Sequence, residues 1–278
     1  MESVINALPL FLLVFMRATS FFITAPIFST RSVPNRFKIG LGFFFALIVT
    51  AGLGTDAELT LDLAFVIIIL KELFIGLSLG FIASLILYTV QVAGAFIDFQ
   101  MGFVMANVID PQTRAQVPII GNFKYMLALL FLVSVDGHHM MLDGLVRSYE
   151  LLPADELLSQ ADSQSLAKFI AEVFAGMFFS AFQLALPIVA SLFLVDVALG
   201  LLARAVPQVN IFVVGLPLKI FVGFVLILVT IPTFFFLLRG VFQEMLATMG
   251  QLIQILGGQY DANLSLTNGS PILFTRKD

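Results

Sequence analysis

The sequence predicts an all-α protein that lies in or against a membrane and is built from long, kinked helical hairpins. Of its 278 residues, 60% are hydrophobic and only 12% are charged, and the mean hydropathy is +1.05. A soluble domain of this length could not bury so much apolar surface, so the solvent must be lipid or a hydrophobic assembly. Long apolar runs recur along the chain, and the loops between them alternate in the sign of their charge.

The composition excludes several classes of function. Cysteine is absent, which removes disulfides, thiolate metal sites and cysteine nucleophiles. The net charge of −4 is small and scattered, which argues against a nucleic-acid partner. The sequence has no phosphate-binding glycine loop, no HExxH motif and no serine with a plausible base nearby, so we expect neither an enzyme nor a cofactor. The first residues lack a basic region and a cleavage site, so we expect this segment to be retained.

The first two apolar runs cover 4–28 and 37–53 and are joined by a basic loop, 29–38. The next connection is acidic and contains Asp56, Glu58 and Asp62. Because cytoplasmic loops carry the excess of Lys and Arg, the basic loop is predicted to be cytoplasmic and the acidic connection external.

The third run, 61–99, is too long for a simple span. As one helix its ~39 residues would extend about 58 Å, whereas the hydrocarbon core is about 30 Å thick. Small residues recur at every fourth position, at Gly76, Gly80 and Ser84. This spacing predicts a face on which another helix approaches closely.

Between 100 and 116 the chain stays apolar but loses helical continuity at glycine, asparagine and an Asp-Pro step. Irregular backbone at membrane depth survives only where protein buries it or where it lines a cavity. One hypothesis is a deformable seal that plugs a passage, since Met and Phe adapt to many shapes and resist water. The other is a loop packed in a core that never touches cargo. The candidate plug residues are Gln100, Met101, Gly102, Phe103, Met105, Val108, Ile109, Asp110 and Pro111.

Three further apolar runs complete six candidate spans: 118–135, 169–202 and 211–238. Pro153 and the polar segment 159–165 mark the predicted division of the chain. After Arg239 the pattern becomes amphipathic and ends at Gly257-Gly258.

Seven ionisable residues fall within or beside the apolar runs: Arg17, Lys71, Glu72, Asp98, Asp196, Arg204 and Lys219. They could form a proton relay, because charged groups at membrane depth are functional candidates. They could instead form inter-subunit or inter-helix salt bridges that fix assembly. We favour salt bridges, because the charges are spread over several helices and form no ladder. Lys71 and Glu72 point about 100° apart on a helix, so we expect each to find its partner elsewhere.

The adjacent histidines His138 and His139 raise the possibility of a metal site. Neighbouring helical side chains diverge, and the chain has no other His and no Cys to complete a ligand set. We therefore expect a helix-terminus or interfacial role and no metal.

Several separated motifs closely resemble the FliR family of flagellar type III export-gate proteins. They are the opening Arg17, Pro26-Ile27-Phe28-Ser29 and Val33-Pro34, then Gln100-Met101-Gly102-Phe103, Asp110-Pro111, Pro118, Gly121 and Gly137-His138-His139. The likeness extends to about Leu256. Leu186-Pro187, Arg204-Ala205, Gln208-Val209-Asn210 and the segment 215–220 look like the helical hairpin of the small gate subunit FliQ.

The resemblance implies a FliP-like part, 1–165, with a plug loop at about 100–116. A FliQ-like hairpin with an amphipathic helix would follow over 166–257, and then an irregular tail, 258–278. It further implies a pore-forming subunit in the bacterial inner (cytoplasmic) membrane, at the flagellar basal body. There it would assemble with FliP and FliQ, next to FlhB and FlhA, contact lipid and pass unfolded flagellar subunits. The resemblance favours the seal for the loop and makes Gln208 and Asn210 a cytoplasmic-side constriction.

Other functions make different demands on the sequence. A secondary transporter would have midplane charges and broken helices, as here, but also matching inverted halves, which this chain lacks. A membrane-embedded enzyme would need paired catalytic residues, which we do not find. Injectisome export-gate proteins resemble the flagellar ones, so an injectisome counterpart is a further alternative.

Overall fold

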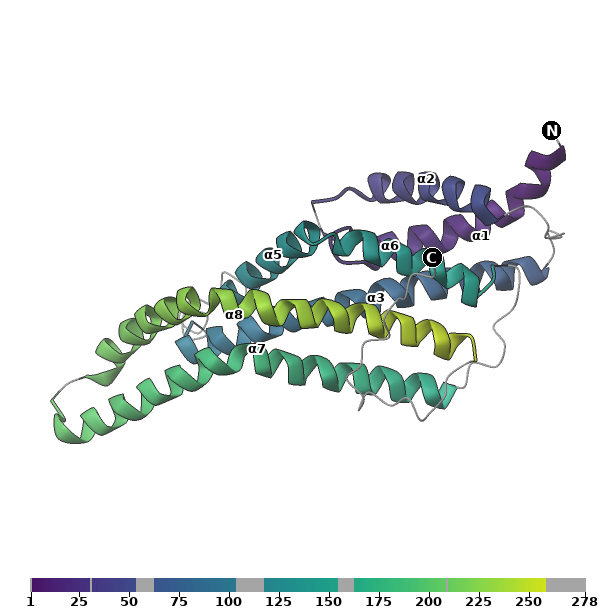
Figure 1. Cartoon of the computed structure of the whole chain (residues 1–278). Coiled ribbons are helices and arrows are strands. Elements are labelled where there is room, and N and C mark those ends of the chain that lie inside the picture. Colours follow the sequence, from purple (N-terminus) through teal and green to yellow (C-terminus); the bar gives the residue numbers. More distant parts are fainter. Residues whose placement is uncertain are drawn as a thin grey trace. The chain divides into compact units, whose positions relative to one another are not determined.

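A computed structural model describes residues 2–30, 32–53, 63–103, 118–154, 163–208 and 210–258. All regular structure in these ranges is helical, which confirms the predicted all-α class. Figure 1 shows the helices in chain order: α1 (Glu2–Thr24), α2 (Asn35–Leu53), α3 (Leu63–Met101), α5 (Ile119–Ser134), α6 (Gly137–Leu151), α7 (Ser163–Ala205) and α8 (Ile211–Leu256).

By length and composition, five of these helices could cross a membrane: α1, α2, α3, α7 and α8. A sixth span results if α5 and α6, a bent pair separated by a short break, are counted together. The helices fall on the six apolar runs of the sequence, and the predicted six spans are reached only when the bent pair is counted as one span.

Two boundaries differ from the sequence prediction. The amphipathic stretch after Arg239 is not a separate helix but the continuation of α8, which also contains Pro217 and Pro232. Gly240 does not interrupt α8, because a single helical glycine costs only about 1 kcal/mol. Helix α6 occupies an acidic segment for which no helix was predicted.

By packing, the chain divides into two compact units that interleave along the sequence. One contains Met1–Ile86, Val135–Val173 and Gln243–Asp278, and the other contains Leu87–Ser134 and Phe174–Phe242. Helices α3, α7 and α8 each contribute residues to both units. The predicted division near residue 165, drawn from Pro153 and the polar segment 159–165 and from the likeness to two other proteins, stays a prediction.

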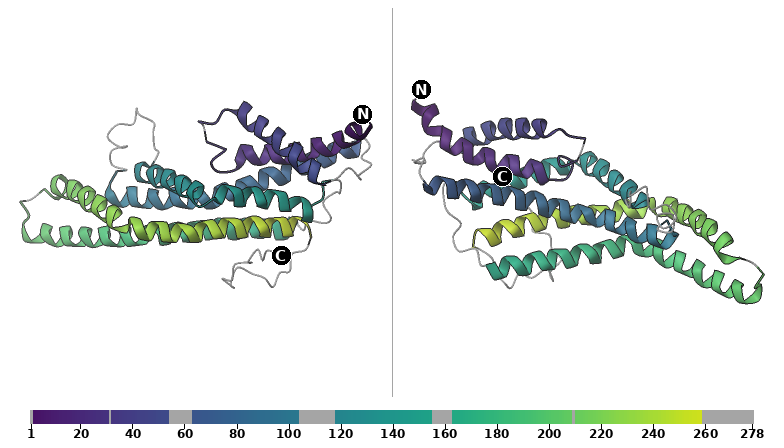
Figure 2. Two further views of the ribbon diagram at one scale, coloured as in Figure 1. Left: turned by 45° about the horizontal axis from the view of Figure 1, so that its top comes forward. Right: turned by 180° about the vertical axis from the view of Figure 1, so that it is seen from behind.

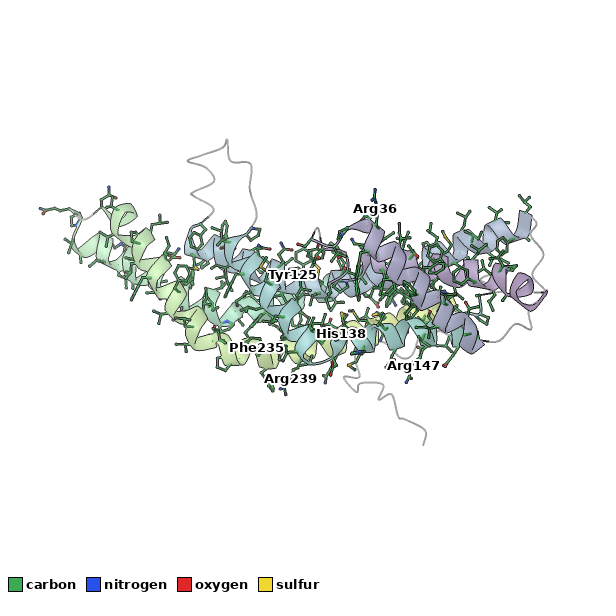
Figure 3. All side chains as sticks on the ribbon, turned by 90° about the horizontal axis from the view of Figure 1, so that it is seen from above. Arg36, Tyr125, His138, Arg147, Phe235 and Arg239 are labelled. Carbon is green, nitrogen blue, oxygen red and sulfur yellow. The ribbon has the colours of Figure 1, made fainter. Side chains whose placement is uncertain are left out.

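In the first unit, α1 and α2 run side by side, as both views in Figure 2 show. The basic side chains of Arg36 and Arg147 project away from the helices (Figure 3), whereas Arg17 is fully buried. The glycine face of α3 lies against α1, because a Cβ at Gly76 would come within 2.2 Å of the Arg17 carbonyl oxygen. The predicted close helix contact is confirmed.

In the second unit, the later part of α3 packs against the start of α5 through two glycines. A Cβ added to Gly94 would lie 2.1 Å from the Gly121 Cα and 2.5 Å from the Gly121 nitrogen. The C-terminal part of α7 and the N-terminal part of α8 form a hairpin (Figure 1). Two aromatic side chains of α8, Phe235 and Phe242, contact Phe131 of α5.

This glycine contact generates a test of helix packing. Gly94→Ala should destabilise the protein by about 1–3 kcal/mol, because backbone on both sides must move. Gly240→Ala is the matched control, since nothing lies within 4 Å of a Cβ there. Alanine should be favoured at that position by up to about 1 kcal/mol. The measurement is the thermal midpoint of helix loss in detergent, and equal midpoints for the two variants would contradict the packing.

Candidate functional site

The end of α3 and the start of α5 form the stem of the predicted plug loop. The loop stem comprises Asp98, the segment 100–103, Ile120 and Gly121. Asp98 is buried, and both of its carboxylate oxygens accept the Ile120 N–H at 3.1 Å, while one also accepts the Gly121 N–H at 3.2 Å. These N–H groups belong to the first turn of α5 and have no partner within that helix. A carboxylate at a helix N-terminus is also favoured by the helix dipole, so Asp98 ties the two helices together.

Helix α3 stops at Gly102, whose φ of 87° lies in the left-handed region. The Gly102 N–H bonds to the Phe99 carbonyl and the Phe103 N–H bonds to the Asp98 carbonyl, each at 3.1 Å. This pair of hydrogen bonds is the Schellman motif, which glycine favours because it has no Cβ. The predicted break at Gly102 is confirmed, and Asp98 holds the chain at both ends of the loop.

The first apolar residues of the predicted plug are used for packing within the chain. Met101 is fully buried, and its side chain lies against Gly223 of α8, where an added Cβ would meet it at 2.6 Å. Phe103 makes an edge contact with Phe224, with ring centroids 6.4 Å apart. Met101 thus fits the packed-core alternative. The remaining candidates, Met105, Val108, Ile109, Asp110 and Pro111, lie outside the described residues.

Gln100 joins the loop stem to a charged group between α7 and α8, which we call the Asp196 cluster (Gln100, Asp196 and Lys219). The Gln100 Nε2 donates to Asp196 Oδ2 at 2.8 Å, and the Lys219 Nζ lies 2.9 and 3.0 Å from the two Asp196 oxygens. The Asp196 side chain remains 39% exposed and the Lys219 side chain 17% exposed. The cluster is therefore paired within the chain, yet it retains a face open to another molecule.

A second charged group lies in the core of the first unit. Arg17 forms a bidentate pair with Glu72, at 2.5 Å from Nε and 2.8 Å from Nη2. It also donates to the Ser148 hydroxyl at 3.0 Å and the Leu152 carbonyl at 2.8 Å. The guanidinium carbon lies 4.1 Å from the centre of the Tyr149 ring. We call these five residues, with Lys71, the Arg17 network.

Lys71 corrects one prediction. Its Nζ lies 2.8 Å from Glu72 Oε1, so these neighbours do pair, contrary to the expectation from their angular separation. The flexible lysine stem lets the ammonium reach back to the carboxylate. Lys71 also donates to the carbonyls of Pro153 and Ala154, at 2.8 and 3.3 Å. These carbonyls follow the C-terminus of α6, where the helix dipole favours cations.

The predicted cytoplasmic-side residues lie around the turn between α7 and α8. Arg204 is in the last turn of α7, where a basic side chain complements the helix dipole. Gln208 and Asn210 are exposed, and the Asn210 carbonyl accepts from the Val213 and Val214 N–H groups at 3.1 and 3.2 Å.

Sequence reasoning missed the contribution of α6 to the Arg17 network. Ser148 and Tyr149 were not singled out, because the segment was described by its acidic residues. Its buried positions nevertheless follow a helical period, at Met141, Leu145, Ser148 and Tyr149. That spacing was the signal that could have revealed the helix.

Comparison with known proteins identifies the family. A family model described as "Bacterial export proteins, family 1" matches residues 8–245. The chain is 48% identical over 257 residues to a protein of Bacillus subtilis (strain 168) named "Flagellar biosynthetic protein FliR", covering 92% of this chain and 99% of the relative. It is 35% identical to the protein of the same name from Pectobacterium carotovorum subsp. carotovorum, covering 79% of this chain and 84% of the relative.

The corresponding protein of Escherichia coli (strain K12) is 31% identical over 87% of this chain and 91% of its own length. These matches extend over both compact units, including the loop stem and the Arg17 network. The chain therefore belongs to the FliR family of bacterial export proteins.

Proposed function

We propose that the chain is a pore-forming subunit of the flagellar type III protein export gate in the bacterial cytoplasmic membrane. It assembles with FliP and FliQ, next to FlhB and FlhA, and its loop helps to seal the closed channel against ions while unfolded flagellar subunits are not passing. The relatives that match most of the chain are named flagellar biosynthetic proteins, which supports a role in flagellar export. The observation that carries the proposal is the loop stem.

The loop stem has the properties that a gate requires. Asp98, the Schellman motif at Gly102 and the glycine contact fix both ends of the loop without using any residue of 104–117. A gating segment must change position while the helices that carry it stay folded. The free N–H groups at the start of α5 bind Asp98, and the last carbonyls of α3 accept the Schellman hydrogen bonds. A displacement of 104–117 therefore need not break these hydrogen bonds.

The exposed apolar surface supports a location inside an assembly or lipid. Along α7 and α8 many large apolar side chains are uncovered in the single chain, among them Phe179, Leu194, Phe221 and Phe236. Surfaces of this kind mark contacts with membrane or with other proteins. Asp196 and Lys219 of the Asp196 cluster lie on the same two helices and remain partly exposed, so we propose that the cluster also meets a neighbouring subunit.

The Arg17 network is proposed to be structural and not a proton relay. A relay group must change its protonation during transport, whereas Arg17 stays charged at any physiological pH. Its carboxylate partner Glu72 accepts from two cations at once, at 2.5 to 2.8 Å. If Glu72 took up a proton, the buried charges of Arg17 and Lys71 would be left uncompensated.

The seal can be tested by electrical conductance. Deleting residues 102–107 should raise the ion conductance of the assembled complex with FliP and FliQ in planar bilayers, because the apolar constriction is shortened. Because this deletion removes Gly102, a second variant keeps the length and replaces Met105, Val108 and Ile109 by Ser. Deleting 268–273 is the control of equal length, outside the family match. Unchanged conductance in both loop variants would refute the seal.

The role of the Asp196 cluster can be tested by exchanging its charges. Lys219→Asp should reduce recovery of the complex, because two carboxylates then face each other. The exchanged pair Asp196→Lys with Lys219→Asp should restore recovery, as measured by co-purification with FliP and FliQ. The exposed pair Lys168 and Glu172, exchanged in the same way, is the control. Restored protein export without restored assembly would favour the relay hypothesis.

The Arg17 network predicts a large loss of stability from one substitution. Glu72→Gln leaves Arg17 and Lys71 buried without their carboxylate, which should cost about 3–5 kcal/mol. Glu150→Gln, at an exposed position on α6, should change stability by less than about 0.5 kcal/mol. Thermal unfolding of the purified chain in detergent measures both. Similar midpoints for the two variants would show that the network does not hold the unit together.

A further inference from the structure

Three potential metal ligands converge at the start of α6. Asp136, His138 and His139 each offer one ligand atom, and these atoms lie within 4.8 Å of one another. From the sequence, the two adjacent histidines were expected to diverge. In the structure their ring centroids are only 4.1 Å apart, with the planes inclined at 41°. The geometric reason for excluding a metal therefore does not hold.

The backbone explains the convergence. Asp136 precedes α6 in the left-handed conformation, with φ 56° and ψ 23°. Its carboxylate makes no hydrogen bond to the first turn of the helix, although Asp at this position commonly does so. The carboxylate instead lies beside His139, with Asp136 Oδ1 and His139 Nδ1 3.5 Å apart. The chain thus places a carboxylate that does not cap the helix next to two imidazoles.

A second observation also points to a ligand. The His138 Nδ1 is buried and has no hydrogen-bond partner in the described part of the chain. A buried imidazole nitrogen without a partner is unfavourable relative to a satisfied one. A hydrogen bond or ion pair between Asp136 and His139 leaves this nitrogen unsatisfied. A cation bound at Nδ1 would give this nitrogen a partner.

We propose that Asp136, His138 and His139 bind one divalent first-row transition-metal ion of the Zn²⁺ type. Two imidazoles and a carboxylate are a typical donor set for such ions and a poor one for Ca²⁺ or Mg²⁺. With bonds of about 2.0–2.2 Å, tetrahedral ligands lie about 3.4 Å apart. The Asp136 Oδ1 and His139 Nδ1 atoms are already about this far apart. The side chains of Asp136 and His139 are 77% and 67% exposed, so they can rotate toward a shared ion. The fourth position would be open to water.

The ion would join the residue before α6 to its first turn. Asp136 lies in the break that separates α5 from α6, so a bound metal would hold that break in its left-handed conformation. This role is independent of the seal and of the Asp196 cluster. It neither requires nor supports the proposed export function.

The chain is unusually suited to a decisive binding experiment. It contains only two histidines, both in this cluster, and no cysteine. The full-length chain, purified in detergent with a tag that lacks histidine, would be titrated with Zn²⁺ by calorimetry at pH 7.5. We expect one Zn²⁺ per chain. Each of His138→Ala, His139→Ala and Asp136→Asn should weaken binding by at least about tenfold.

The controls distinguish loss of a metal ligand from misfolding and from loss of any nearby negative charge. Asp143→Asn removes an exposed carboxylate of the same helix and should bind Zn²⁺ like the unmodified chain. Asn tolerates the left-handed region, so Asp136→Asn removes the charge without new backbone strain. Circular dichroism at 222 nm checks that each variant retains its helices.

A spectroscopic measurement gives a second criterion. Cu²⁺ bound to the unmodified chain should show electron paramagnetic resonance splitting from two imidazole nitrogens, and from one in each histidine variant. Binding of Zn²⁺ with unchanged affinity in any of the three ligand variants would overturn the three-ligand site. Absence of stoichiometric binding to the unmodified chain would overturn it as well, and would leave a helix-terminal pair of Asp136 and His139.

Discussion

The first unit depends on the pairing of Arg17 with Glu72. A guanidinium in the middle of an apolar helix is costly, and it is tolerated only when its donors are satisfied. Here four of its N–H donors are used, two on Glu72, one on Ser148 and one on the Leu152 carbonyl. Helices α1 and α3 can therefore pack closely only when the end of α6 is also in place.

The second unit also contains a buried charge whose hydrogen-bonding capacity must be satisfied. There the buried charge is Asp98, and the groups that satisfy it are backbone N–H groups of α5. The glycine pair Gly94 and Gly121 makes this possible, because any side chain would separate the two backbones. In both units a buried charge thus joins segments that are distant in sequence. Apolar contacts alone would fix the register between these segments less strictly, because the hydrophobic effect is not directional.

Much of the architecture could be predicted from local patterns. The apolar runs, the glycine face of α3 and the helix break at Gly102 depend on neighbouring residues only, so the sequence reveals them. The partners of Arg17, Lys71 and Asp196 are separated from them by many residues, and no local pattern indicates which charges meet. Lys71 and Glu72 were misjudged because angular separation on a helix ignores how far a lysine side chain reaches. The convergence of His138 and His139 depends on one left-handed residue, Asp136, which a helical projection cannot represent.

The doubly anchored stem has an evolutionary consequence. Because Asp98 and the Schellman bonds close the stem, the length of the intervening segment has little influence on the helices that flank it. Loop-closure entropy grows slowly, by about 0.6 kcal/mol for each doubling of length. Natural selection can therefore lengthen, shorten or rewrite this segment while the scaffold stays constant, and a reporter group inserted there would leave the flanking helices intact.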